Sequence, residues 1–289
     1  MKSIFKEQLK TFDKLSLTEL NAKASYLKRI DRKFLLTNSQ FKEVLKDLKQ
    51  DFQVLEIAEN RVFSYDNIYM DTDDYLFYNQ HQNRVNPRTK IRTRLYEDSN
   101  LAFFEYKHKI DWVTRKFRYD FPIEEHGKMT KWKKRFFEWV WQSINEWAKA
   151  PTISQAIKTK YKRITLVSRN WTERLTIDFD IKTIDLRDKN KKEIELKGLV
   201  IIESKSMSKK CFSCEIMKKH WLKQAKACSK YSLWVVYSWL AKKFDHFKET
   251  MEKIKEIRME TLKNRTRTTS LKSGFTRTKI SAKSTVLKK

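Results

Sequence analysis

The sequence has no apolar run that approaches the roughly 20 residues a helix needs to span a bilayer. The longest candidate, Tyr231–Ala241, is too short, and residues 1–12 lack the apolar centre of a secretory signal. The three cysteines are too few for a disulfide framework and suggest a reducing compartment. These absences argue against a membrane-spanning or secreted disulfide-rich protein, and we expect a cytoplasmic one.

Glycine and proline are also scarce, with three of each in 289 residues, and a composition poor in both but rich in lysine inflates the positive charge. The formal net charge is +28, and residues 261–289 carry nine Lys or Arg and no Asp or Glu. The rest of the chain is therefore basic as well. Such a charge attracts nucleic acid, anionic lipid or polyphosphate alike, so the placement of the cations has to decide between them.

Alternation of polar and apolar residues predicts an antiparallel sheet with added helices, an α+β fold with one main domain. The predicted strands are 27–36, 62–70, 88–96, 101–109, 114–122, 160–168, 171–182 and 199–206. The predicted helices are 16–25, one that begins at Asn38 or Ser39, a short one capped by Thr72, an inserted amphipathic one at 128–149, one at 216–226 and one from Tyr231. The segment 188–192 reads as a charged turn.

Cations recur at two-residue spacing along these strands. Lys90, Arg92 and Arg94 share one face of a strand, because successive side chains of a strand point to opposite faces. The same spacing aligns further charged residues on other strands: Arg29, Asp31 and Lys33; Glu105, Lys107 and Lys109; Lys116 and Arg118; Lys162; Arg174; Asp178 and Asp180; Glu203 and Lys205.

A solvated, charged face is the ordinary alternative for any single strand. Several strands with paired cations are harder to explain in that way, since like charges on neighbouring strands cost stability. The pattern indicates a site for a phosphate-rich polyanion. The interspersed acids suggest a divalent metal, Mg²⁺ or Mn²⁺, with Glu203 as the best candidate ligand, because carboxylates hold these ions beside phosphate groups.

Seven ordered motifs resemble the VTC-type polyphosphate polymerase domain, a member of the triphosphate tunnel metalloenzyme superfamily. They are YLKRIDRKFLL, YMDTDDYLFYNQH, KIRTRLYE, FFEYKHK, YKRITLVSRNWTERLTIDFDI, IIESK and SKYSLWV. The resemblance covers roughly residues 25–240. It implies an antiparallel β-barrel, the triphosphate tunnel, with surrounding helices, and a metal-dependent enzyme that transfers the γ-phosphate of ATP to a growing polyphosphate chain.

The resemblance also implies roles for individual residues and boundaries for the parts of the chain. Catalytic phosphate clamps would be Arg92, Arg94, Lys107, Arg163 and Arg174; further phosphate-binding residues would be Lys33, Lys90, Lys116, Arg118, Lys205 and Lys230; Glu203 would hold the metal. We expect a helical segment at 1–24, the tunnel domain at 25–241 with a helical insertion at about 128–150, a helix at 242–262, and a basic disordered tail at 263–289.

Other readings stay open at this point. A non-catalytic polyphosphate- or RNA-binding module and a tunnel-type triphosphatase would use the same cations. A zinc site at Cys211, Cys214, His220 and Cys228 is weakly indicated, because a single CxxC lacks a second paired motif. The Trp-rich helix is more simply packing than a stacking platform for nucleic acid. The basic tail could bind a polyanion or an anionic membrane face, and a membrane-associated partner is a further candidate.

Overall fold

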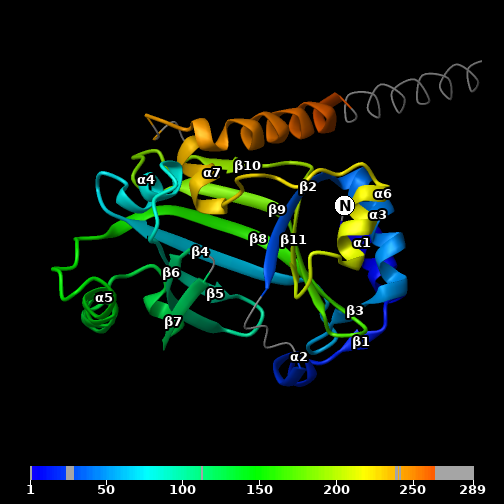
Figure 1. The fold of residues 1–289 in the computed structure, drawn as a ribbon, viewed down its shortest axis with the longest axis horizontal. Helices are drawn as coiled ribbons and strands as arrows, with labels where there is room; N and C mark the ends of the chain where they lie inside the picture. Colours follow the sequence, from blue (N-terminus) through cyan, green and yellow to red (C-terminus); the bar gives the residue numbers. More distant parts are fainter. Residues whose placement is uncertain (1, 24–28, 112, 238–239, 241, 264–289) are drawn as a thin grey trace, which may run out of the picture.

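The computed structural model describes residues 2–23, 29–111, 113–237, 240 and 242–263 (Figure 1). Its strands form a single, largely antiparallel sheet in which the strand order is β2-β11-β9-β8-β4-β5-β6-β7. These strands are β2 (Ile30–Thr37), β4 (Phe63–Asp71), β5 (Arg88–Tyr96), β6 (Leu101–Ile110), β7 (Val113–Phe121), β8 (Ser154–Ser168), β9 (Glu173–Asp185) and β11 (Leu199–Ser206). Short strands β1 (Lys14–Leu15), β3 (Phe52–Leu55) and β10 (Glu193–Glu195) extend it, with β1 parallel to β3.

The sheet is curled, and Figure 1 shows β2 running steeply across the direction of β4 and β8. The curl brings Lys33 of β2 close enough to influence Lys90 of β5 and Lys109 of β6, which stand far from β2 in the strand order. The α+β class and the antiparallel sheet are confirmed. Among the described residues β2 and β7 remain edge strands, so backbone hydrogen bonds do not close the predicted barrel.

Helices cover the outer face of the curl and one of its ends. Helices α1 (Lys2–Lys10), α3 (Asn38–Asp51) and α6 (Phe212–Lys219) pack on β2, β9 and β11, where Leu36, Ile177 and Ile202 are fully buried. Helix α5 (Lys131–Ile144) covers β5, β6 and β7 through Phe137 and Val140. Because the outer face is apolar, the charged side chains of the same strands point to the opposite face.

The third apolar cluster fills one end of the curl. Helix α7 (Lys230–Tyr237) contributes Tyr231 and Trp234, which pack with Leu35, Ile201 and the helix at 248–263. Helix α4 (Leu76–Gln82) lies beside α7 in Figure 1. This end of the inner space is therefore filled with side chains.

The sequence misplaced several element boundaries. Helix α3 is capped by Thr37, not by Asn38 or Ser39, because the Thr37 hydroxyl accepts from the Gln40 N–H while the Gln40 side chain accepts from the Thr37 N–H. Helix α6 occupies 212–219 rather than 216–226. Strand β8 begins six residues before the predicted position, at Ser154.

The N-terminal segment also differs from the expected wholly helical one. Between α1 and α2 (Leu17–Lys23) it adds β1 to the sheet. Helix α5 lies inside the predicted helical insertion. The C-terminal helix covers 248–263, so it starts later than the predicted helix at 242–262 and ends one residue after it. Apart from residue 263, the predicted basic tail lies outside the described residues. In the part of the chain that the structure describes, no helix is both long enough and apolar enough to cross a bilayer.

Candidate functional site

The inner face is defined here as the side of the sheet that carries Lys33, Lys90, Arg92, Arg163 and Glu203. The register places the other charged residues of the predicted site on this face, since pairing partners on adjacent strands point the same way. The cross-strand pairs are Lys33↔Glu203, Lys205↔Arg174, Arg163↔Asp178, Arg92↔Glu105, Lys90↔Lys107, Lys107↔Lys116 and Glu105↔Arg118. The structure thus brings these predicted residues to a single surface.

Glu105 is the centre of the first charge cluster and is completely buried. Its Oε2 accepts from Arg92 Nε at 2.7 Å, and its Oε1 lies 2.7 Å from Lys116 Nζ and 3.5 Å from Arg118 Nη2. Arg94 Nε stands farther away, at 3.9 Å. Burial would raise the pKa of the Glu105 carboxyl, but the surrounding cations hold it well below its usual range. Glu105 therefore stays ionised and fixes the side chains of Arg92 and Lys116 in place.

Asp178 is the centre of the second cluster. Arg163 binds it with both ends of the guanidinium, Nε to Oδ1 at 2.6 Å and Nη2 to Oδ2 at 2.8 Å. Lys230, the first residue of α7, donates to the same Oδ2. The pKa of Asp178 is lowered despite its burial because these two cations stabilise the carboxylate. Helix α7 is in this way tied to the inner face of the sheet.

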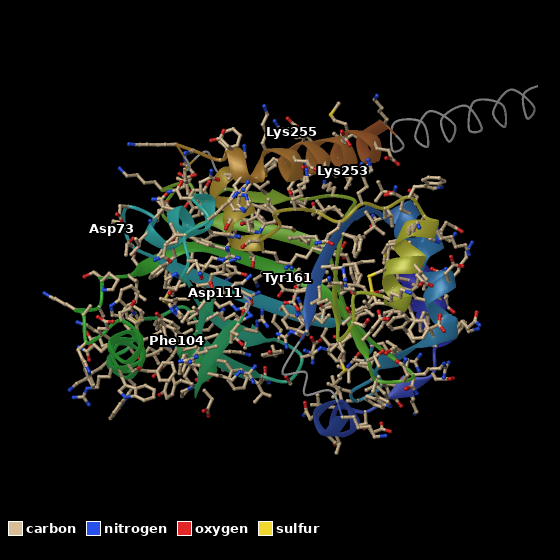
Figure 2. All side chains as sticks on the ribbon, viewed as in Figure 1. Asp73, Phe104, Asp111, Tyr161, Lys253 and Lys255 are labelled. Carbon is tan, nitrogen blue, oxygen red and sulfur yellow. A yellow bond between two sulfur atoms is a disulfide. The ribbon has the colours of Figure 1, made fainter. Side chains whose placement is uncertain are left out.

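Aromatic rings join the first two clusters. Tyr65 and Tyr161 are stacked, with ring centroids 5.3 Å apart. The Arg163 guanidinium lies over Tyr65 at 4.8 Å and that of Arg94 at 5.4 Å from the same ring. Asn67 accepts from Arg94 Nε at 2.8 Å. Tyr161, labelled near the centre of the molecule in Figure 2, therefore lies among cations rather than in an uncharged core.

Glu203 belongs to a third cluster, which is less buried. Its side chain is 19% exposed, Lys205 donates to its Oε1, and Lys33 Nζ lies 3.9 Å from its Oε2. Lys205 also lies 3.5 Å from Asp31, which Arg29 holds at 3.1 Å. Burial, opposed in part by Asp31, lowers the pKa of Lys205 to about 7. In the part of the chain that the structure describes, the ion pairs of Glu203 are with lysines, so this carboxylate is held less rigidly than Glu105.

Two cations face each other near the start of β5 and in the second half of β6, without a carboxylate between them. Lys90 lies directly opposite Lys107, and Lys90 Nζ donates to Ser229 Oγ at 2.9 Å. Burial and the nearby charge of Lys33 lower the pKa of Lys90, and the charge of Arg92 followed by burial lowers the pKa of Lys107. An anion bound here would relieve this repulsion.

The predicted site residues differ in exposure. Lys116 and Arg118 are both 39% exposed on β7, the edge strand, whereas the side chains of Arg92, Arg94 and Arg163 are largely buried. Arg174 is half-buried beside Lys205. The inner face therefore grades from a rigid, buried centre to an open edge.

The predicted site omitted several groups that the structure places in it: Asp31, Asn67, Glu105, Tyr65, Tyr161 and Asp178. Spacing had aligned Asp31, Glu105 and Asp178 with the cations, so two-residue alternation was a usable signal for the carboxylates. The tyrosines follow the same alternation, since Tyr161 lies two positions before Arg163 and pairs with Tyr65, but an uncharged ring gives no sign in the sequence that it lies among cations.

A metal ion fits this face only if a bound phosphate supplies some of its oxygen ligands. Among the described residues no group of three or more His, Cys, Asp or Glu side chains is arranged to hold one. Glu203, with Asp31 on the neighbouring strand β2, nevertheless offers carboxylate oxygens on a phosphate-binding face. Mg²⁺ is commonly held by one or two carboxylates together with substrate phosphates, so these residues suit a metal that arrives with its substrate.

The sequence predicted reduced cysteines, but two of the three are joined in a disulfide. Cys211 and Cys214 form a disulfide, because the start of α6 brings their Cα atoms to 5.2 Å. The zinc alternative loses two of its ligands to this bond. His220, a third, is bound to Asp47 at 2.7 Å. Cys228 keeps a free thiol beside the charges of the inner face.

The model of the VTC domain matches residues 28–237. The chain belongs to the VTC domain family. The match spans β2 to α7 and so includes every strand that carries a predicted site residue. A search of curated proteins found no significant match.

Several solved structures are similar to this chain in fold. A candidate adenylate cyclase from Bacillus halodurans is 17% identical, with a TM-score of 0.45 over 70% of this chain and 94% of that chain. A candidate adenylyl cyclase from Hippeastrum, described as having a dominant triphosphatase activity, is 12% identical, with a TM-score of 0.45 over 76% and 100%. The RNA triphosphatase Pct1 of S. pombe is 9% identical, with a TM-score of 0.27 over 70% and 82%.

Proposed function

We propose that this VTC domain is a polyphosphate polymerase that transfers the γ-phosphate of ATP to a growing polyphosphate chain. The observation that carries the proposal is the convergence of cations from β2, β5, β6, β7, β8, β9 and β11 on one inner face with carboxylates among them. Phosphoryl transfer needs mainly positioning and charge neutralisation, which such a face supplies without a covalent nucleophile.

The chain's own residues have distinct parts in this proposal. Arg92 and Arg94, held by Glu105, and Arg163, held by Asp178, would grip the triphosphate of ATP. A terminal oxygen of the polyphosphate chain then bonds to the γ-phosphorus, the bond to the β,γ-bridging oxygen breaks, and ADP leaves with that electron pair. Because the clamps are fixed in advance by buried carboxylates, little reorganisation accompanies the reaction.

The other predicted residues would surround the reacting phosphates. Lys107 and Arg174 would complete the set of clamps, while Lys33, Lys90, Lys205 and Lys230 would bind neighbouring phosphates, with Lys116 and Arg118 at the edge. Glu203 would hold Mn²⁺ or Mg²⁺, which would neutralise negative charge on the phosphates. No described residue of this arrangement indicates a membrane-associated partner.

Incubation of the purified protein with ATP and Mn²⁺ tests the proposal. We expect ADP and long phosphate chains, detected by chromatography and by gel staining of the products. ADP with inorganic phosphate but no chains would indicate a triphosphatase that uses water as acceptor. Absence of ADP, with retained polyphosphate binding, would reduce the protein to a binding module.

A further inference from the structure

A second cationic hollow lies at the ends of β5 and β6, outside the predicted site. Its volume is about 80 Å³, and it is open to solvent. The residues that line it are Arg84, Val85, Asn86, Arg88, Lys109 and Asp111. They come from the start of β5, the end of β6 and the segments next to them, and Figure 2 labels Asp111 of this group. None of the lining residues has a role in the function proposed above.

The strand register makes this hollow a continuation of the inner face. Arg88 lies directly opposite Lys109, and this pair continues the row formed by Lys90 and Lys107. Side chains two positions apart on a strand point the same way, so all four cations share one side of the β5–β6 ribbon. Like charges directly opposite each other destabilise a sheet, and here two such pairs follow in succession.

The surroundings of the cations change along this row. At its inner end Arg92 is bonded to the buried Glu105. Lys90 and Lys107 follow, and then Arg88 and Lys109 at the hollow. The carboxylate that lines the hollow, Asp111, accepts from Asn86 Nδ2, while its backbone N–H donates to Asn86 Oδ1 at 2.8 Å. The described lining thus holds three cations, Arg84, Arg88 and Lys109, and one carboxylate, Asp111.

Charges of the inner face shift the pKa of a lysine in the hollow, and a charge of the hollow shifts the pKa of a lysine on the inner face. Burial and the charge of Arg88 lower the pKa of Lys109; across the curl, Asp31 raises it and Lys33 lowers it further. Arg88 in turn contributes to the lowered pKa of Lys90. A polyanion on the inner face would therefore meet a continuous positive potential as far as the hollow.

We propose that this hollow, the outer phosphate site, binds the part of an inorganic polyphosphate chain that extends beyond the phosphates held on the inner face. The inference rests on the proposed function, since it takes the inner face to bind phosphates. Among the described residues that line it, none carries an aromatic ring for base stacking, which favours polyphosphate over a single-stranded nucleic acid. The site would retain a long chain between successive transfers.

Binding measurements with two probes test the outer phosphate site without any turnover. Tripolyphosphate reports on the inner face, and a long-chain polyphosphate reports on both sites; their affinities are measured by calorimetry at fixed salt. The double variant Arg88→Ala, Lys109→Ala should lose about tenfold or more in affinity for the long chain, because two charge-assisted contacts are removed. Its affinity for tripolyphosphate should change by less than about twofold.

A variant that is expected to raise the affinity shows that a loss of affinity in the double variant is not due to misfolding. Asp111→Asn removes the negative charge while its amide oxygen can still accept from Asn86, so it should raise the affinity for the long chain by about two- to threefold. Lys253→Ala is the matched control, because Lys253 is a half-exposed cation on the C-terminal helix and is well separated from Asp111 in Figure 2. It should leave both affinities unchanged.

The outcomes separate the two proposals. Equal losses for both probes in the double variant would make Arg88 and Lys109 part of the inner site, and unchanged affinities would remove the outer phosphate site altogether. Long-chain DNA that binds as tightly as polyphosphate, with the same sensitivity to the double variant, would also overturn it. A wild-type protein that binds neither probe would refute the proposed function itself.

Discussion

The carboxylates of the inner face fall into two kinds. Glu105 and Asp178 are almost fully buried, with 0% and 1% of their side chains exposed, and each is held by an arginine together with a lysine. Glu203 is 19% exposed and is held by lysines. Arginine offers a planar fork that fixes a carboxylate in one geometry, whereas lysine is a flexible point charge. The difference suggests that the first pair organises the clamps and that Glu203 is the one free to change partners.

Replacing Glu105 with Gln should have the largest effect on the free energy of unfolding. The change leaves Arg92 and its neighbours without their buried counter-charge, so we expect a loss of about 3 to 5 kcal/mol in the free energy of unfolding. Denaturant titration measures it. Glu97→Gln is the control, because Glu97 is exposed beside Lys160, and should cost less than about 1 kcal/mol. Similar losses in both variants would show that Glu105 has no organising part.

The Glu203→Ala variant should behave in the opposite way. If Glu203 holds the metal, turnover of ATP should fall by about a hundredfold or more. The unfolding free energy should change by less than about 1 kcal/mol, since the side chain is partly solvated and its partners are lysines. Full activity would contradict the metal assignment, and a large loss of stability would erase the distinction between the two kinds of carboxylate.

Acid unfolding sharpens the same contrast. The cations lower the pKa of Glu105 in the folded protein, so its stabilising contribution is present above the unfolded value of about 4.5 and is lost as the pH falls. At about pH 3 the wild-type protein should have lost about 2 kcal/mol from this group. Denaturant titrations between pH 6 and pH 3 should show a shallower slope for Glu105→Gln. An identical slope would mean that Glu105 is not the carboxylate responsible.

The sequence predicted the sheet well because two-residue alternation is a local property. Strands β5 and β11 have the predicted bounds, and the cations of the predicted site share the expected face. Helix caps were predicted less well, since Thr37 lies in the strand pattern of β2 and only the reciprocal bonds with Gln40 reveal it as a cap. Which carboxylate meets which cation depends on strand order, and strand order is set by long-range pairing.

The role of the tyrosines and of the outer phosphate site could not be predicted for a related reason. Tyr161 shares the face of Arg163 by simple alternation, but the cations around it belong largely to other strands, and their approach depends on long-range pairing. Arg88 and Lys109 are spaced like the other cations. Their shared hollow, however, arises from the turn segments around Arg84 and Asp111, whose positions follow from tertiary packing.

The smallest expected effect concerns a single clamp. Arg92→Ala removes one of the cations at Glu105, and its affinity for tripolyphosphate should fall by about tenfold, because a charge-assisted contact in a partly buried site is lost. Lys243→Ala, a change of an exposed residue on the segment before the C-terminal helix, should change the affinity by less than about twofold. Calorimetry at two salt concentrations measures both, and the wild-type salt dependence should be reduced only in Arg92→Ala. If the two variants lose affinity equally, tripolyphosphate binds through diffuse surface charge, and the buried carboxylates then organise no clamp at all.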